Sequence, residues 1–196
     1  RSSDLWTPTT NTTYLTRPTE TKPASKATSL SSPNYTDQRF STKIYKITDR
    51  DEEIGGSITK IRNVYAKCPV FNSDGSRYLV VTSDGWYHIY NASTLAHING
   101  GQSGSGGMNG ALPSMAGENC CAQWSPTDPN KIIYTANDGG LTWYEMDITT
   151  GTSTTKFSFS GRLSALGLGS ATRTTMGAEG RPSNDHRYWH LMCTSG

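Results

Sequence analysis

Hydrophobic and polar residues alternate over short runs of this chain, and turn-forming residues separate the runs. The stretch YLVVTSDGWYHIYNASTL, Tyr78 to Leu95, places two β-rich runs around Ser-Asp-Gly and then reaches a Thr-rich turn. Asp-Gly is typical of a two-residue hairpin, because both central residues must reach positive φ. The pattern therefore predicts two strands joined by a tight hairpin and followed by an outer strand. Two earlier runs, 39–49 (RFSTKIYKITD) and 55–71 (GGSITKIRNVYAKCPVF), also predict strands.

The same order of features returns further along the chain. FNSDGSRYLVVTSDGWYHIYNAST and WSPTDPNKIIYTANDGGLTWYEMDITTG both run from an aromatic residue through a polar turn, a strand, Asp-Gly, an aromatic strand and a Thr-rich turn. Tyr78 aligns with Ile132 and Asp84 with Asp138, each at an offset of 54 residues. A third start, RPSNDHRYWHLMCTSG, places Tyr188 at 56 residues after Ile132. Near-constant spacing indicates an internal repeat.

A four-stranded antiparallel unit repeated every ~40 to 55 residues is typical of a β-propeller blade. The sequence predicts an all-β protein, a partial β-propeller of about two and a half four-stranded antiparallel blades. Residues 39–196 would form the blades, and residues 1–38 a Thr/Ser/Pro-rich arm or linker. The third copy reaches Gly196 inside its own hairpin. An open ring exposes strand edges, so the chain is expected to be a fragment or processed product, with the other blades missing or supplied by another chain.

The segments SDGSRYLVV, SPTDPNKIIYTANDGG and EGRPSNDHRYWHLM resemble blade motifs of secreted bacterial β-propellers, in particular propeller-type polysaccharide lyases that act on uronate-containing glycans. The resemblance covers residues 60–196. It implies an extracellular propeller that binds an acidic polysaccharide and, if it is an enzyme, cleaves it by β-elimination. The alternative is a non-catalytic cell-surface or filament protein, assembled through its N-terminal arm and exposed blade edges. A protein-interaction propeller inside cells is a third hypothesis, which the composition disfavours.

Composition and charge limit the classes of partner that this chain is expected to bind. Charged residues make up only 17% of the chain and the formal net charge is +2, so no strong field recruits nucleic acid. No apolar run approaches the ~20 residues of a membrane-spanning helix. The Thr/Ser-rich, Lys-poor composition favours an extracellular or cell-surface location. The expected partner is a polysaccharide or another protein subunit. No cofactor is predicted, and nothing in the sequence indicates a divalent cation.

The candidate binding site lies where the middle-strand hairpins and the connections between blades meet, on one face of a propeller. Long Gly-rich connections at 99–119 and around 167–181 reach the same face, and long loops in compact domains are often functional. Polar side chains there would bind sugar hydroxyls and carboxylates, with an indole as stacking platform. The predicted binding residues are Asp84, Trp86, Glu118, Asn119, Asp138, Glu179 and Arg181. In the alternative, the two aspartates only shape hairpins, and Glu179 and Arg181 form a local ion pair.

None of the histidines can be assigned as a catalytic residue from the sequence. His88 in WYHIY and His190 in YWHLM are predicted to lie in the middle of strands, packed and hydrogen-bonded. His186 lies in a turn that should face the opposite side. The catalytic residues therefore stay unassigned, and no metal ligand is predicted.

Four cysteines occur, and their spacing matches no zinc site. The repeat aligns Cys68 with Cys121 on neighbouring inner strands, which would permit a disulfide between blades if the two Cα atoms are close enough. Cys193 could pair with Cys120 or with a residue outside this chain. Free thiols in packed positions are the other interpretation.

Overall fold

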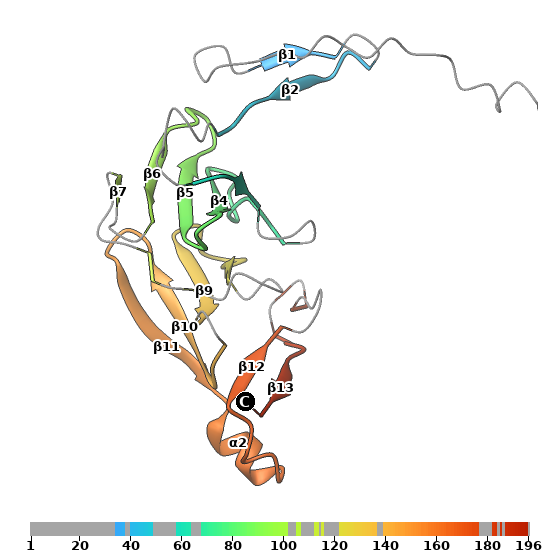
Figure 1. Cartoon of the computed structure of the whole chain (residues 1–196), viewed down its shortest axis with the longest axis vertical. Helices are drawn as coiled ribbons and strands as arrows, with labels where there is room; N and C mark the ends of the chain where they lie inside the picture. The colour runs from blue at the N-terminus through green and yellow to red at the C-terminus, as the bar shows by residue number, and fades with distance from the viewer. Residues whose placement is uncertain are drawn as a thin grey trace, which may run out of the picture.

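The computed structural model shows a nearly all-β chain whose sheets follow one another along its longest axis (Figure 1). It describes residues 34–37, 40–48, 58–63, 68–101, 105–106, 112–113, 115, 122–136, 139–176, 182–183, 185 and 187–195. Most of the predicted N-terminal arm, residues 1–38, therefore lies outside the described residues. The predicted all-β class is confirmed: one large sheet has four antiparallel strands and the other has four and an added fifth, which is consistent with partial propeller blades.

The first sheet has five antiparallel strands in sequence order. These are β3 (Ile61–Arg62), β4 (Arg77–Thr82), β5 (Tyr87–Asn91), β6 (His97–Gly100) and β7 (Ser105–Gly106). The β4–β5 hairpin and the turn into β6 are the elements that the alternating pattern predicts. β7 adds a fifth strand on the outside of β6.

The hairpin between β4 and β5 has three loop residues, so the predicted two-residue hairpin is wrong. The N–H of Gly85 donates to the carbonyl of Thr82 at 2.9 Å, and the N–H of Thr82 donates to the carbonyl of Trp86 at 2.9 Å. Gly85 has φ 86°, whereas Asp84 has a negative φ. This is the longer hairpin in which a tight turn is followed by one left-handed residue. Only the glycine therefore needs positive φ.

The second sheet contains β8 (Ala122–Trp124), β9 (Lys131–Thr135), β10 (Thr142–Asp147) and β11 (Thr152–Ser158). Its order is β11-β10-β9-β8, with antiparallel pairing throughout. The cross-strand pairs follow the repeat: Leu79↔Ile89 in the first sheet corresponds to Ile133↔Glu145 in the second. One apolar position of the first sheet is thus a glutamate in the second.

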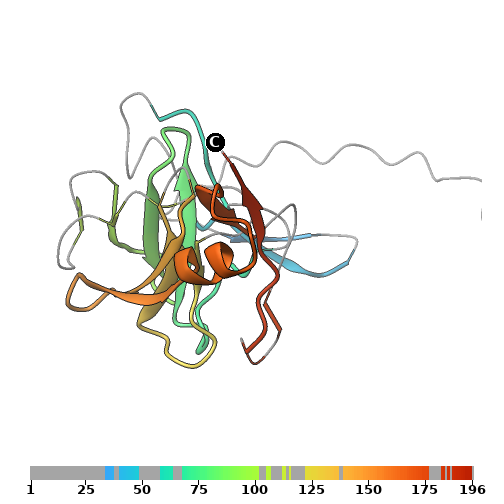
Figure 2. The same cartoon turned by 90° about the horizontal axis from the view of Figure 1, so that it is seen from below.

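Short elements lie at both ends of the two larger sheets. β1 (Asn34–Thr36) pairs with β2 (Lys43–Tyr45), and β12 (Arg173–Thr175) pairs with β13 (Met192–Thr194). Helix α2 (Ser160–Ala165) follows β11, and the repeat pattern does not predict it. Seen from below, α2 and the β12–β13 pair lie at the C-terminal end of the stack (Figure 2).

The third copy keeps its predicted turn but shortens its strand. The N–H of Ser183 donates to the carbonyl of Tyr188 at 2.9 Å, as Asn72 does to Arg77 in the first copy at 3.0 Å. His190 is exposed and lies outside any strand, so its predicted packed, mid-strand position is wrong. β13 begins only at Met192 in the structure.

Apolar residues from the two large sheets form one shared core layer. Both sheets contribute to it, together with two residues of the connection between them: Leu79, Val81, Tyr87, Ile89, Leu112, Met115, Ala122, Trp124, Ile132, Tyr134, Met146 and Ile148. The indole N–H of Trp124 donates to the carbonyl of Val70 at 3.0 Å, and Arg77 donates to the Asn130 side-chain oxygen at 2.7 Å. Burial and hydrogen bonds therefore both hold the second sheet against the first.

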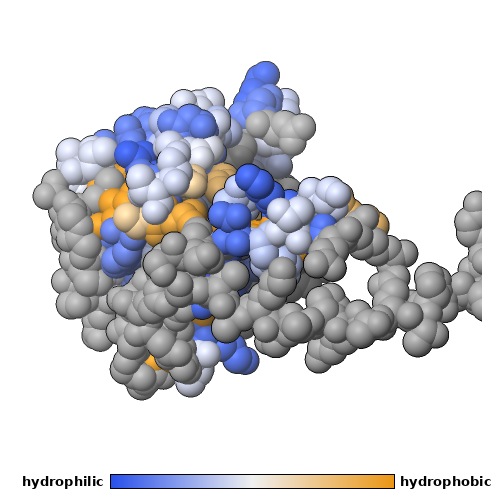
Figure 3. Space-filling model, turned by 90° about the horizontal axis from the view of Figure 1, so that it is seen from above, coloured by the Kyte–Doolittle hydropathy of each residue, from blue (hydrophilic) through white to orange (hydrophobic). Residues whose placement is uncertain are grey.

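Two smaller apolar clusters cover the outer faces. Ile133, Trp143 and Met176 pack with Phe157, Phe159, Trp189 and Leu191, which connects the second sheet to the third copy. Tyr78, Val80 and Tyr90 pack with Ile47 and Ile61 on the N-terminal side. Seen from above, apolar residues are exposed at the surface among hydrophilic ones (Figure 3). No helix in the described part of the chain is long and apolar enough to span a membrane.

Candidate functional site

Of the predicted binding residues, the structure describes two, Asp84 and Trp86. The other five lie outside the described residues: Glu118, Asn119, Asp138, Glu179 and Arg181. Asp84 is exposed and accepts hydrogen bonds from the Thr82 hydroxyl and, at 3.3 Å, from the N–H of Trp86. These bonds give Asp84 a role in shaping the hairpin. The Trp86 side chain is half-buried.

The hairpin ends of the two large sheets collect further segments. The N–H of Ser83 donates to the carbonyl of Lys60 at 3.0 Å, which places the segment before β3 beside the first hairpin. Met115, from the Gly-rich connection, forms a β-bridge with Ala136 at the start of the second hairpin. Gly140 forms another bridge with Thr174 of β12. Described parts of the connections therefore lie beside the hairpins, as expected for a propeller face.

A histidine pair lies on β5 and β6, next to the first hairpin. His88 is buried, with only 3% of its surface exposed, and its Nδ1 lies 3.1 Å from Nε2 of the half-buried His97. Burial lowers the pKa of His88 to about 4; the neighbouring His97 lowers this pKa further, and Asp84 opposes the shift. Burial also lowers the pKa of His97. The prediction that His88 is packed and hydrogen-bonded within a strand is confirmed.

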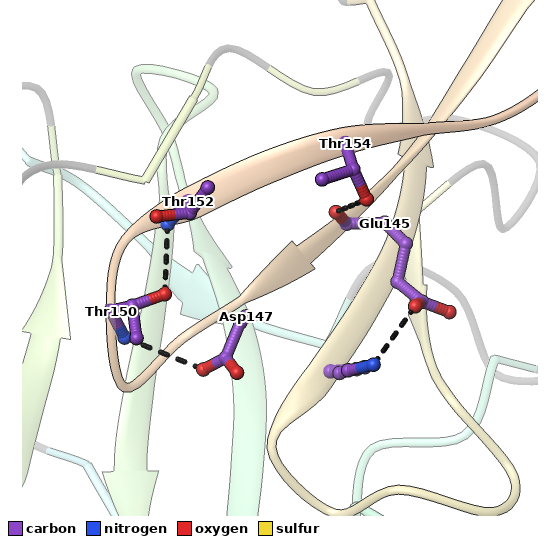
Figure 4. Close-up of a pocket in the computed structure, with 6 residues that line it drawn as sticks. Glu145, Asp147, Thr150, Thr152 and Thr154 are labelled. Atoms are coloured by element: carbon purple, nitrogen blue, oxygen red, sulfur yellow. Dashed lines mark hydrogen bonds and ion pairs between the residues drawn. The ribbon is translucent and has the colours of Figure 1, made fainter.

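A polar cavity of about 320 Å³ opens at the opposite end of the second sheet. Lys131 begins β9 and pairs with Asp147 at the end of β10, whereas the hairpin joins the other ends of these strands. Four side chains from β10, β11 and the turn between them complete the lining: Glu145, Thr150, Thr152 and Thr154. Figure 4 shows these groups along β10 and β11, with the threonine hydroxyls and Glu145 around one hollow.

Two lysines hold the Glu145 carboxylate in this cavity. Lys131 Nζ lies 3.1 Å from Glu145 Oε1, and Lys156 Nζ forms an ion pair with Glu145 Oε2. Burial by itself raises the pKa of Glu145, but the hydrogen bonds from Lys156 and Lys131 outweigh it and lower this pKa. The Glu145 side chain is 16% exposed, against 34% for Lys131 and 38% for Lys156. Each ammonium group keeps N–H donors that can reach a ligand.

The turn between β10 and β11 fixes the other end of the cavity. Asp147 Oδ1 accepts hydrogen bonds from the N–H of Thr149 at 2.8 Å and from the N–H of Thr150 at 3.4 Å. The hydroxyl of Thr150 accepts from the N–H of Thr152 at 3.3 Å, and Thr154 donates to the Glu145 carbonyl at 3.5 Å. Asp147 therefore orders the turn, and the threonine hydroxyls line the hollow.

Sequence reasoning missed this cavity because it concentrated on the hairpin face. The repeat itself contained a usable signal: Glu145 occupies the position of Ile89, which is fully buried in the first sheet. A charged residue at a repeat position that is otherwise apolar indicates a local departure from a packed blade interface.

The described residues also bear on metal binding and on the cysteines. The described residues contain no group of three or more His, Cys, Asp or Glu side chains that could hold a metal ion. Cys68 is buried and disulfide-bonded, to a partner outside the described residues. Cys193 is free, so its pairing with Cys120 is wrong. The pairing of Cys68 with Cys121 stays a prediction.

Comparisons with known proteins find similarity to a solved structure. No protein-family model matches the chain, and no curated protein matches it. The crystal structure of oligogalacturonate lyase from Vibrio parahaemolyticus is 21% identical in sequence, with a TM-score of 0.39. The similarity covers 64% of this chain and 28% of that chain. This chain therefore corresponds to a minor part of the lyase's length.

Proposed function

We propose that this chain supplies blades to an extracellular β-propeller that binds an acidic polysaccharide. The observation that carries the proposal is the cavity lined by Lys131, Glu145, Asp147 and three threonine hydroxyls, with Lys156 paired to Glu145 beside it. Ammonium groups bind carboxylates through charge-assisted hydrogen bonds, and hydroxyl and carboxylate oxygens bind sugar hydroxyls. Its volume falls at the lower end of ligand pockets, about 300 to 1,000 Å³. One sugar-acid unit is the ligand that this lining supports.

The hairpin face is proposed as a second contact surface for the same polymer. Trp86 is half-buried beside the hairpin, where its exposed ring surface supports sugar stacking. The Lys60 backbone lies next to Ser83 in that hairpin, so a cation-bearing residue adjoins the same end of the sheet. The contribution of the other five predicted residues to this surface stays a prediction, because they lie outside the described residues.

Cleavage by β-elimination is the finer proposal. The reaction needs a base that removes the proton next to a carboxylate, and a cation that neutralises that carboxylate. Lysines 131 and 156 would supply the cations, whereas no described residue is assigned as the base. An absorbance assay for unsaturated uronate products on pectin-like and ulvan-like substrates tests this step.

Binding is tested by calorimetric titration with polygalacturonate at low salt. The double variant Lys131→Gln/Lys156→Gln removes both charges but keeps side chains that can hydrogen-bond to Glu145. We expect at least a tenfold loss of affinity. The matched control is Lys43→Gln, which replaces an exposed lysine of β2. Equal binding by the double variant, or equal binding of neutral dextran by the wild type, would contradict the proposal.

The non-catalytic structural role remains the second candidate. One observation favours it: β11 is an edge strand whose first five residues are exposed. Exposed edges pair readily with other strands. If the role is structural, the protein should assemble through this edge and polygalacturonate should give no heat of binding.

A further inference from the structure

A β-bulge between β5 and β6 turns His97 toward His88. The register skips one residue of β6 at this point: the pairs are His88↔Gly100, Ile89↔Asn99 and Tyr90↔His97. Without the extra residue, His97 would pair one position later on β5 and point to the opposite face, because side chains alternate along a strand. Bulges commonly re-aim a side chain in this way. The backbone therefore places both histidines on the same face of the sheet.

A glycine opposite His88 lets the two strands approach closely at this point. A Cβ on Gly100 would lie 2.5 Å from the His88 Cα and 3.0 Å from its Cβ, so a larger residue would force the strands apart. The His97 ring forms a hydrogen bond with the Asn99 backbone and packs beside the Tyr90 ring, with 5.0 Å between the ring centroids. Histidines that bind metals commonly use such a second hydrogen bond to fix the ring.

The facing nitrogens have the separation that two ligands of one metal ion have. His88 Nδ1 lies 3.1 Å from His97 Nε2. Imidazole nitrogens bind Zn²⁺ at about 2.0–2.1 Å, so two of them at this separation subtend about 100° at the ion. That angle lies between the ~90° of a square-planar site and the ~109° of a tetrahedral site. The carboxylate of Asp84 acts electrostatically on His88, and its negative charge favours a cation here.

We propose that His88 and His97 together bind one divalent transition-metal ion, with Cu²⁺ bound more tightly than Zn²⁺. In the metal-free protein, one of the facing nitrogens donates a hydrogen bond to the other. The ion replaces that proton, which moves to the outer nitrogen of the same ring, so both imidazoles stay neutral. No third His, Cys, Asp or Glu among the described residues joins the pair. Water fills the remaining positions from the side of His97, which is half-buried.

Binding is tested by calorimetric titration of the whole chain with Cu²⁺, in a buffer that contains glycine as a weak competitor. His97→Gln should bind Cu²⁺ at least tenfold more weakly than the wild type, because it leaves one ligand where two acted together. The matched control is His190→Gln, which replaces an exposed histidine and should bind like the wild type. Ca²⁺ should give no heat of binding, because this ion prefers oxygen ligands. Equal Cu²⁺ affinity in His97→Gln, or an equal loss in His190→Gln, would overturn the inference.

Electron paramagnetic resonance of the wild type gives a test that does not depend on whether a variant folds. With one equivalent of Cu²⁺, the spectrum should show hyperfine coupling to two imidazole nitrogens, and His97→Gln should lose one of these couplings. A wild-type spectrum with one nitrogen ligand, or with oxygen ligands alone, would mean adventitious surface binding and would refute the site. Neither measurement involves the cavity around Glu145, so the proposed polysaccharide site stands or falls separately.

Discussion

Acid should destabilise this protein through one buried histidine. Burial lowers the pKa of His88 to about 4, against the ordinary 6.5 that applies in the unfolded chain. Between these two pH values the unfolded chain binds more protons than the folded one, so stability falls as pH falls from 6.5 to 4. The difference of 2.5 pKa units corresponds to a loss of about 3 kcal/mol, at about 1.4 kcal/mol per unit. Above pH 7 this histidine no longer contributes to the dependence of stability on pH.

The perturbation is His88→Gln, which keeps a polar partner for His97 and removes the titration. Urea unfolding at pH 7, 6, 5 and 4 gives the free energy of unfolding at each pH. The wild type should lose about 3 kcal/mol more than the variant over this range, and the loss that remains reports His97, whose pKa burial also lowers. His190→Gln, at an exposed position, should follow the wild type. Parallel curves for the wild type and His88→Gln would refute the reasoning.

Three further predictions concern two glycines, one buried hydrogen bond and the Cys68 disulfide. Gly100→Ala should lower the free energy of unfolding in urea by more than about 2 kcal/mol, because a Cβ at φ 143° would lie 2.4 Å from the carbonyl oxygen of Tyr87. Gly161→Ala in α2 should raise it by about 0.5 to 1 kcal/mol, because a Cβ there meets nothing within 4 Å. Similar effects at the two sites would contradict this interpretation. Thr174→Val should cost about 1 to 3 kcal/mol, because it leaves the buried Trp143 indole N–H without the acceptor it has at 3.0 Å; an unchanged thermal midpoint would contradict it. Reduction of the Cys68 disulfide should cost about 2 to 5 kcal/mol; peptide mapping without reductant should find Cys121 as the partner, and Cys120 in its place would disprove the repeat alignment.

The elements that local sequence chemistry determines could be predicted. The strand–hairpin–strand order of β4 and β5 follows from alternation around Asp84-Gly85, and the repeat carries it to β9 and β10. The hairpin length could not be predicted, because Asp-Gly fits both the two-residue and the three-residue loop. His190 lies in an alternating run, yet the strand begins only at Met192. Pairing with a neighbour determines where a strand starts, and the local pattern does not contain that information.

The candidate site was harder to predict than the fold. The cavity depends on Lys131, Glu145 and Lys156, which lie on three different strands and meet only when the register is known. A solvated charge and a cavity-lining charge look alike in a single sequence. Helix α2 was missed for a related reason: its sequence, SGRLSA, is short and buries no residue, so no apolar stripe marks it.

The two apolar layers give the molecule separate optical reporters. Trp124 lies in the apolar layer that the two large sheets share. Trp143 lies in the layer between the second sheet and the third copy, where its ring packs edge-on against Trp189 with 5.6 Å between the ring centroids. Exposure of an indole to water shifts its fluorescence emission to the red. With the other tryptophans replaced by phenylalanine, each emission band would record the opening of its own layer during denaturation. An earlier shift from Trp143 than from Trp124 would mean that the stack unravels from its C-terminal end, one layer at a time.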